Sequence, residues 1–406
     1  MIDLVKNLSI TSRRVKGSVI RELLKLTEKP GMISFAGGLP SPESFPVKDI
    51  ADIAQKVLKE NSATALQYSS TEGRIELREE IVKFMAKDGF DIEPDNVLVT
   101  ASSQQGLDLV GRAFIDPTDP ILVELPTYVG GLQSFSAYGA RFIGVRSDEH
   151  GMIPGDLHKK LQYLHDTEEH YKFAYVVPDF QNPSGITWTL DRRRELVKMA
   201  NKYNCLIVDD SPYRELRFEG SAPPTFSALD KEDNVITLRT FSKIFAPGFR
   251  LGWVVAHKSI IAKLSLVKQS VDLCTSAYSQ LIAAEYLKRG LMTAHIEHTV
   301  KIYRAKRDAM LRALKAHMPK DAGVSWIKPD GGLFLWLKLP EHVSADEMFP
   351  EAIKQKVAYV IGSAFHCDGT GQNTMRLNFS YSSLEEIEEG IQRLARTIES
   401  RLRVRV

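Results

Sequence analysis

Residues 235–250 read Val-Ile-Thr-Leu-Arg-Thr-Phe-Ser-Lys-Ile-Phe-Ala-Pro-Gly-Phe-Arg. The first four are apolar or β-branched, which is typical of a buried strand, and Lys243 follows shortly after them. A lysine is usually a solvated surface charge, but the hydroxyls of Thr240 and Ser242 and the guanidinium of Arg250 are close to this one in sequence. A lysine amine can bond an aldehyde carbon, and hydroxyl and guanidinium groups can hold a phosphate. The stretch therefore indicates a site for a phosphorylated aldehyde at the end of a strand.

Short β-branched runs alternate with longer helical patterns along the chain, which is typical of a parallel sheet covered by helices. The expected strands are residues 97–100, 121–124, 173–177, 206–209 and 235–238. A polar segment follows each strand, at residues 103–105, 126–128, 182–185, 210–213 and 242–243. Ligands of open α/β sheets bind beyond the carboxyl ends of the strands. We therefore expect these segments to converge on one crevice.

The remaining sequence predicts a smaller α+β unit built from both chain ends. A helical region is expected at 276–317, followed by strands at 324–327, 333–337 and 374–379. The last helix begins at Ser383, and Glu386 three residues later completes a capping box. The expected division is an N-terminal segment that contributes to the site and the small domain, a large cofactor-binding domain and a small C-terminal domain, at residues 1–45, 46–290 and 291–406.

Composition excludes several classes of protein. The 406 residues are 43% apolar, which is enough for a substantial core, and the net charge of +2 provides no field for nucleic acid or an anionic membrane. No run approaches the roughly 20 apolar residues of a membrane helix. Cys205, Cys274 and Cys367 lack metal-ligand spacing and are typical of reduced thiols. We expect a cytoplasmic protein without a bound metal.

Two further polar groups point to a ligand. Ser103 and Gln104 precede a helical pattern, where backbone N–H groups favour a phosphate, although a serine there can simply cap the helix. Asp210 closes an apolar strand, so its carboxylate needs a cationic or hydrogen-bonding partner. A protonated ring nitrogen would serve, and so would a salt bridge within the fold.

Three residues in neighbouring loops are placed to contact the ring. Asn182 and Tyr213 follow consecutive expected strands and can donate to a ring oxygen, although Asn-Pro-Ser-Gly is also an ordinary turn sequence. Tyr128 follows another strand, where an aromatic ring can stack on a ligand or pack in the core.

Several motifs occur together in a fixed order. They are Ser-Phe-Ala-Gly-Gly-Leu-Pro at 34–40, Leu-Gln-Tyr-Ser at 66–69, Ser-Gln-Gln-Gly at 103–106, Gln-Asn-Pro-Ser-Gly at 181–185, Ser-Lys at 242–243 and Arg-Leu-Asn-Phe-Ser at 376–380. With these motifs the chain resembles, over essentially its full length, the class I and II aminotransferases among the fold-type I pyridoxal-phosphate enzymes. It is most similar to the subgroup of 2-aminoadipate and kynurenine aminotransferases. The resemblance implies an α/β fold like that of aspartate aminotransferase, with a mostly parallel seven-stranded sheet flanked by helices and a smaller α+β domain.

The resemblance assigns roles around the ring of pyridoxal 5'-phosphate. Lys243 would bond the cofactor as an imine, and Asp210 would pair with the pyridine nitrogen. Tyr213 and Asn182 would bind the ring hydroxyl, and Tyr128 would stack on the ring.

The phosphate and the substrate have their own implied partners. The phosphate would be held by Ser103, Gln104, Thr240, Ser242 and Arg250, together with Tyr68 of the partner subunit. Arg376 would bind the substrate α-carboxylate beside Asn182, and Gly38 would let the backbone approach the substrate. Arg21 would either meet a distal carboxylate of glutamate or 2-aminoadipate or remain a solvated helix charge. A shared phosphate site makes a homodimer necessary for activity.

The implied reaction is a ping-pong transfer of the amino group of an L-amino acid to 2-oxoglutarate. The implied donors are 2-aminoadipate and aromatic or branched-chain amino acids, and Asp210, Lys243 and Tyr213 are the catalytic residues. A β-lyase or a decarboxylase would use the same cofactor cradle, and a non-catalytic sensor with this fold is a further alternative. Such sensors carry a DNA-binding module ahead of the fold, and only residues 1–33 precede Ser34. A nicotinamide-dependent enzyme is disfavoured, because no Gly-x-Gly-x-x-Gly follows the first expected strand.

Overall fold

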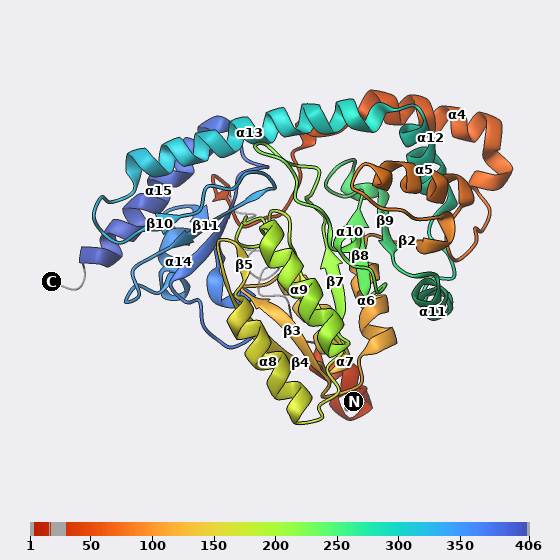
Figure 1. Cartoon of the computed structure of the whole chain (residues 1–406). Helices are drawn as coiled ribbons and strands as arrows, with labels where there is room; N and C mark the ends of the chain where they lie inside the picture. The colour runs from red at the N-terminus through yellow and green to blue at the C-terminus, as the bar shows by residue number, and fades with distance from the viewer. Residues whose placement is uncertain (1–3, 16, 18–29, 404–406) are drawn as a thin grey trace.

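A large sheet forms the centre of the computed structural model, which describes residues 4–15, 17 and 30–403 (Figure 1). Its strand order is β2-β9-β8-β7-β6-β3-β4-β5. The bounds are β2 (Val97–Thr100), β3 (Pro120–Leu125), β4 (Arg141–Asp148), β5 (Gly151–Met152), β6 (Phe173–Val176), β7 (Leu206–Asp210), β8 (Val235–Thr240) and β9 (Gly252–Val255). Strands β4, β3, β6, β7 and β8 are parallel, whereas β9 is antiparallel to both of its neighbours.

The mostly parallel sheet and all five expected strands are confirmed. The sheet has one strand more than the seven expected, because the chain reverses after β4 and the two residues of β5 pair back on it. Gly151 makes this reversal possible: its φ is +116°, and a Cβ there would lie 2.5 Å from the Trp188 ring. A side chain at this position would meet both backbone strain and a clash.

Helices cover both faces of the sheet. Alternate residues of β6 show the division, since Phe173 and Tyr175 join one buried apolar cluster and Ala174 and Val176 join another. The first cluster lies under α6 (Ser103–Phe114), α7 (Val129–Tyr138) and α11 (Lys258–Gln269), and the second under α8 (Pro154–Asp166) and α9 (Leu190–Tyr203). The polar segments that follow the parallel strands therefore lie at one end of the sheet, beyond the carboxyl ends of these strands.

A smaller sheet of order β10-β11-β14-β13 lies beside the large one. Its strands are β10 (Ser325–Trp326), β11 (Phe334–Lys338), β13 (Val360–Ile361) and β14 (Thr374–Asn378), and all of its pairs are antiparallel. Helices α14 (Ala345–Lys354) and α15 (Leu384–Arg403) accompany it. The expected capping box is present, because the Ser383 N–H donates to Glu386 Oε2 at 2.8 Å and the Glu386 N–H donates to Ser383 Oγ at 3.2 Å.

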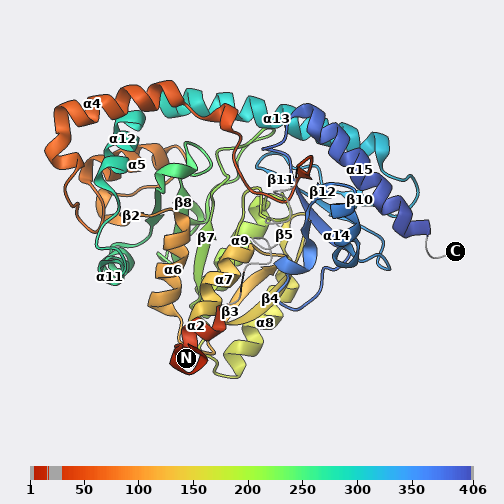
Figure 2. The same cartoon turned by 180° about the vertical axis from the view of Figure 1, so that it is seen from behind.

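Both ends of the chain meet at this smaller sheet. Strand β1 (Ile33–Ser34) pairs in parallel with β12 (Val357–Ala358), and the Asn378 N–H donates to the Phe35 carbonyl at 2.8 Å. Figure 2 shows the amino-terminal segment passing beside α15. Residues more than 300 positions apart in sequence therefore lie side by side.

The helical region expected at 276–317 is two helices, α12 (Ala277–Lys288) and α13 (Leu291–His317). The break lies at Gly290, whose φ of +70° is outside the helical region. Helix α13 runs along one side of the molecule from α12 and α4 (Val47–Ala65) to α15 (Figure 1). Within the described ranges, no helix combines the length and the apolar character that a membrane crossing requires.

Candidate active site

Lys243 lies in the loop after β8 and points at the amino-terminal segment. Its Nζ donates to the Gly38 carbonyl at 2.8 Å. Burial, together with the positive charges of Arg376 and Arg250, lowers the pKa of Lys243 to about 8. Near this pH a large fraction of the amine is neutral, which is the form that attacks an aldehyde carbon.

Asp210 ends β7 and is buried, with one carboxylate oxygen satisfied and one open. Oδ2 accepts a hydrogen bond from the Tyr175 hydroxyl at 2.8 Å, whereas no donor from the described residues reaches Oδ1. Burial raises the pKa of Asp210 to about 7, although the bond from Tyr175 acts in the opposite direction. Buried polar atoms normally have a partner. The open oxygen therefore fits a ligand that presents an N–H, such as a protonated pyridine nitrogen.

Arg376 on β14 approaches the same groups from the smaller sheet, and its charge acts on Lys243. Its Nη1 donates to Asn182 Oδ1 at 2.8 Å, and its Nη2 donates to the Ala36 carbonyl at 2.6 Å. The guanidinium lies 4.3 Å from the centre of the Phe334 ring and 5.3 Å from that of Phe365. Burial lowers its pKa to about 10, so it stays charged near neutral pH. A buried guanidinium with both NH₂ groups oriented is suited to a carboxylate.

Two tyrosines line the space between these groups. The Tyr213 ring meets the Phe334 ring edge-on, with 5.7 Å between centroids. Burial raises the pKa of Tyr213 well above its ordinary value, while the Asn182 amide acts to lower it. Tyr128 caps α7, and burial together with the charge of Asp210 raises its pKa to about 12. Both phenols therefore stay protonated and can donate hydrogen bonds.

Hydroxyl and guanidinium groups gather where a phosphate is expected. Thr240 Oγ1 donates to Ser242 Oγ at 3.0 Å, and Arg250 Nη2 donates to Ser102 Oγ at 2.7 Å. Ser103 is the first residue of α6, and a Cβ on Gly252 would lie 2.6 Å from the Ser103 nitrogen. Glycine at 252 thus lets β9 come close to the start of α6, where backbone N–H groups favour an anion.

Two candidate side chains, those of Gln104 and Tyr68, do not join this cluster, and a third candidate cannot be placed. The Gln104 amide is exposed and donates to Ser134 Oγ at 2.6 Å on α7. The Tyr68 side chain lies on the surface and is 77% exposed. Arg21 belongs to residues 18–24, which lie outside the described part of the chain.

The contacts of three other residues were not anticipated from the sequence. Tyr175 donates to Asp210, Ser102 accepts from Arg250, and the carbonyl of Gly38 accepts from Lys243. The contact of Tyr175 could have been expected from its place within an apolar strand, because a buried phenol needs a hydrogen-bond partner. Ser102 stands next to the expected helix start, but the carbonyl direction at Gly38 has no counterpart in the sequence.

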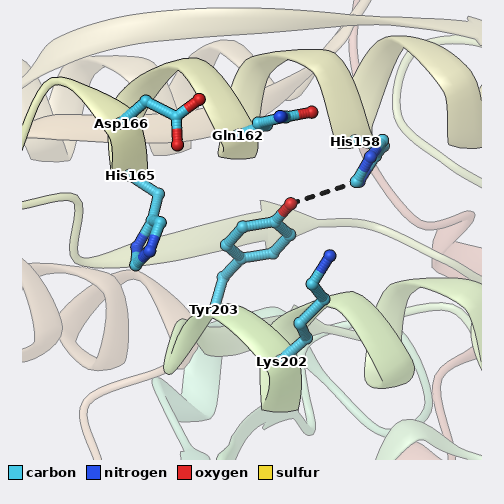
Figure 3. Close-up of a pocket in the computed structure, with 6 residues that line it drawn as sticks. All are labelled: His158, Gln162, His165, Asp166, Lys202 and Tyr203. Carbon is cyan, nitrogen blue, oxygen red and sulfur yellow. Dashed lines mark hydrogen bonds between the residues drawn. The ribbon is translucent and has the colours of Figure 1, made fainter.

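A separate pocket of about 260 Å³ lies between α8 and α9 (Figure 3). It is lined by His158, Gln162, His165, Asp166, Lys202 and Tyr203. Tyr203 ends α9 just before β7 begins, so this pocket is at the amino ends of the strands, opposite Lys243 and Asp210. Within the described residues, no group of three or more His, Cys, Asp or Glu side chains could hold a metal ion.

Comparisons with known proteins agree with this geometry. The family model of aminotransferase class I and II matches residues 31–394. The chain is 46% identical over 404 residues to aromatic-amino-acid aminotransferase 1 of Thermococcus litoralis, covering 99% of this chain and 96% of that protein. It is 40% identical over 392 residues to 2-aminoadipate transaminase of Thermus thermophilus, covering 96% of each. A crystal structure of Pyrococcus horikoshii kynurenine aminotransferase, in complex with PMP, KYN as substrates and KYA as products, has a TM-score of 0.94 and 44% identity and covers 98% of each chain.

The resemblance based on the sequence motifs is confirmed by these matches. The open carboxylate oxygen, the lysine of lowered pKa and the oriented guanidinium also fit the cofactor that the family uses. The chain belongs to the aminotransferase class I and II family, its cofactor is pyridoxal 5'-phosphate, and its chemistry is transamination.

Proposed function

We propose that the chain transfers the amino group of an L-amino acid to 2-oxoglutarate by a ping-pong mechanism. The proposed donors are 2-aminoadipate and aromatic or branched-chain amino acids, since similar proteins are named for aromatic and 2-aminoadipate transamination. The observation that carries the proposal is one cluster that contains an amine of lowered pKa on Lys243, an open carboxylate oxygen on Asp210 and a buried guanidinium on Arg376.

Each of these groups has a distinct task. Bound pyridoxal phosphate supplies an electron sink for the pair released when the substrate Cα proton leaves. Asp210 keeps the ring nitrogen protonated, because a cation beside a carboxylate favours the charged forms of both. Lys243 takes the proton from the substrate Cα and returns it at the cofactor C4′ position, and tethering places its amine near both carbons. Arg376 holds the α-carboxylate through two parallel donors.

The remaining residues hold the cofactor and the substrate in place. Tyr213 and Asn182 bind the ring hydroxyl, Asn182 also steadies Arg376, and Tyr128 packs against the ring. The phosphate is held by Ser103, Thr240, Ser242 and Arg250, and by Gln104 through its backbone N–H in the first turn of α6, since its side chain turns to Ser134. Gly38 admits the substrate, and its carbonyl holds the Lys243 amine until a cofactor is bound. Arg21 would contact a distal carboxylate of the substrate.

We also propose a cytoplasmic homodimer with shared active sites. Tyr68 and the neighbouring Leu66 are 77% and 74% exposed in the single chain, which supports a role against a second copy. Three free cysteines support a reducing compartment. Within each subunit, residues 46–290 would form the cofactor-binding domain and residues 291–406 the small domain, with residues 1–45 contributing to the site and to the small domain.

The proposal is tested by the absorption spectrum of the purified protein as single L-amino acids are added without a keto acid. Replacement of the visible band by the near-ultraviolet band of the aminated cofactor, with release of the keto acid, identifies the donor. A visible band that persists with every donor, or carbon dioxide or ammonia as the product, would contradict transamination. Lys243→Ala should keep the cofactor without a covalent bond and lose the reaction, and full turnover by this variant would overturn the role of Lys243.

A further inference from the structure

A network of acids and arginines with a buried centre lies next to the site and has no task in the chemistry above. Its members are Asp88, Asp179, Glu215, Arg193, Arg214, Arg217 and Arg239. Charged side chains are seldom fully buried unless they are paired, and removing ions from water is costly. Packed apolar residues are often as stabilising as a buried ion pair. Folding stability alone therefore gives no reason for a network of this size beside the cofactor loops.

Asp179 is the acid that most of these arginines share. Its Oδ1 accepts from Arg193 Nη2 at 2.7 Å, and its Oδ2 accepts from Arg214 Nη1 at 3.1 Å. Arg217 Nη2 lies 3.8 Å from Oδ1. Burial acts to raise the pKa of Asp179, but the charges of Arg193 and Arg214 outweigh it and hold that pKa below its ordinary value. The Asp179 carboxylate is thus fully ionised and held from several directions.

The network joins the loops that carry the ring-binding groups. Asp179 lies in the loop after β6, three residues before Asn182, and Arg214 directly follows Tyr213 in the loop after β7. The Arg214–Asp179 pair is therefore a direct bridge between the two loops. Arg193, on α9, strengthens it by donating to the Pro178 carbonyl at 3.1 Å as well as to Asp179.

The adjacent strand is tied to the same network. Arg239 precedes Thr240 on β8, and it donates to Glu215 Oε1 at 2.8 Å and to Asp88 Oδ2 at 2.9 Å. Asp88 also pairs with Arg214 Nε at 3.1 Å. Directional, charge-assisted bonds of this kind fix geometry more tightly than apolar contacts do.

We propose that Asp179 is a positioning residue for transamination, because its bonds to Arg193 and Arg214 set the spacing of the Asn182 and Tyr213 side chains at the ring hydroxyl. This inference rests on the roles proposed above for Asn182 and Tyr213. Asn182 also accepts from Arg376 at 2.8 Å, so a shift of its loop would misplace the α-carboxylate site as well. The network therefore acts on catalysis without touching the substrate or the cofactor.

Two adjacent arginines provide a matched test. Arg193→Lys keeps the charge but loses the forked contact with Asp179. Arg192→Lys makes the same change one residue earlier on α9, where Arg192 donates to Asp148 Oδ2 at 2.6 Å, away from both loops. The measured quantities are the pH midpoint of the visible absorption band of the bound cofactor, kcat and KM. Donors to the ring hydroxyl oxygen favour its ionised form, so weakening them raises that midpoint.

Arg193→Lys should raise the midpoint by about one pH unit and lower kcat roughly 10- to 10²-fold, whereas Arg192→Lys should change neither. Asp179→Asn should have the same effect in a larger degree, and Arg193→Lys keeps the test valid if that variant does not fold. Equal midpoints for the two lysine variants would overturn the proposal. A lower kcat with an unchanged midpoint would also overturn it, because that result indicates a general loosening of the structure.

Tyr213→Phe distinguishes the positioning role of Asp179 from the proposed contacts with the ring hydroxyl. If it raises the midpoint and Arg193→Lys does not, only the positioning role fails, and if it leaves the midpoint unchanged, the proposed ring contacts fail as well.

Discussion

The ionisation of Asp210 depends on a neighbouring side chain, because the Tyr175 hydroxyl donates a hydrogen bond to its Oδ2. Asp210 must be ionised to pair with a protonated ring nitrogen, and its pKa of about 7 makes that form pH-dependent before the cofactor binds. A carboxyl group is charged above its pKa. The cofactor affinity of the apoprotein should therefore fall as the pH drops through about 7.

Tyr175→Phe should move this transition to higher pH, because the hydrogen bond from Tyr175 lowers the pKa of Asp210 and its loss therefore raises that pKa. The measurement is the dissociation constant of pyridoxal phosphate from the apoprotein on both sides of neutrality. Tyr171→Phe is the matched control, since the Tyr171 hydroxyl donates to the Tyr203 carbonyl, away from the site. The same midpoint in Tyr175→Phe and Tyr171→Phe would contradict the link between Tyr175 and Asp210.

Arg376→Lys should lower kcat/KM for amino-acid donors by roughly 10- to 10²-fold, because an ammonium cannot offer two parallel donors to a carboxylate. The loss should be expressed mainly in KM, since the carboxylate is bound before and during the reaction. Amino-acid amides, which lack the carboxylate, should react equally slowly with both proteins. A variant that discriminates against the amides as strongly as the parent protein does would assign the carboxylate to another residue.

At the scale of elements, the approach of β9 to the start of α6 depends on Gly252. Gly252→Ala places a Cβ 2.6 Å from the Ser103 nitrogen and 2.7 Å from the Arg239 carbonyl, so strand and helix must separate. We expect a loss of about 1–3 kcal/mol in the free energy of unfolding and weaker binding of the cofactor phosphate.

The control for this change is Gly155→Ala on α8, where an added Cβ meets nothing within 4 Å. That variant should be neutral or more stable by up to about 1 kcal/mol, because alanine favours a helix. Denaturant unfolding and titration with inorganic phosphate measure the two effects. Unchanged phosphate binding in Gly252→Ala would show that the α6 start does not hold the anion.

Most elements near the site were predictable, for a physical reason. The parallel strands are buried on both faces, so β7 and β8 read as continuous apolar runs that end at polar groups. Strand β4 was not expected, because its charged residues interrupt the run. Strand β9 was not expected either, because it begins with Gly252, and glycine is depleted in strands. The break at Gly290 was not expected, because a single glycine within a long helical pattern is weak evidence that the helix ends there.

The site was predictable as a set of side chains but not as a set of contacts. Lys243 and Asp210 stand at strand ends, where position alone indicates chemistry. The bond from Lys243 to the Gly38 carbonyl depends on how two distant segments face each other, and so does the bridge between Asp179 and Arg214. Such pairings arise from tertiary packing and leave no local pattern.

For the whole molecule, the shared-site proposal makes a prediction about mixed dimers. Tyr68→Ala and Lys243→Ala should each be impaired alone. A mixture allowed to exchange subunits should regain about one quarter of the parental activity, since half of the dimers are hybrids and each hybrid has one complete site. The measurement is the rate before and after exchange. No recovery in a mixture shown to contain hybrids would mean that Tyr68 serves its own subunit.

The pairing of β1 with β12 also has a consequence for how the protein is made. Residues 33–34 bond to residues 357–358, and Phe35 bonds to Asn378, so these partners leave the ribosome long after the first segment does. At roughly 5–20 residues per second, the delay is on the order of 15 to 60 s. During that time the large sheet can form around Asp210 and Lys243, while residues 33–35 still lack their strand partners. The active site is thus completed only near the end of synthesis of the chain.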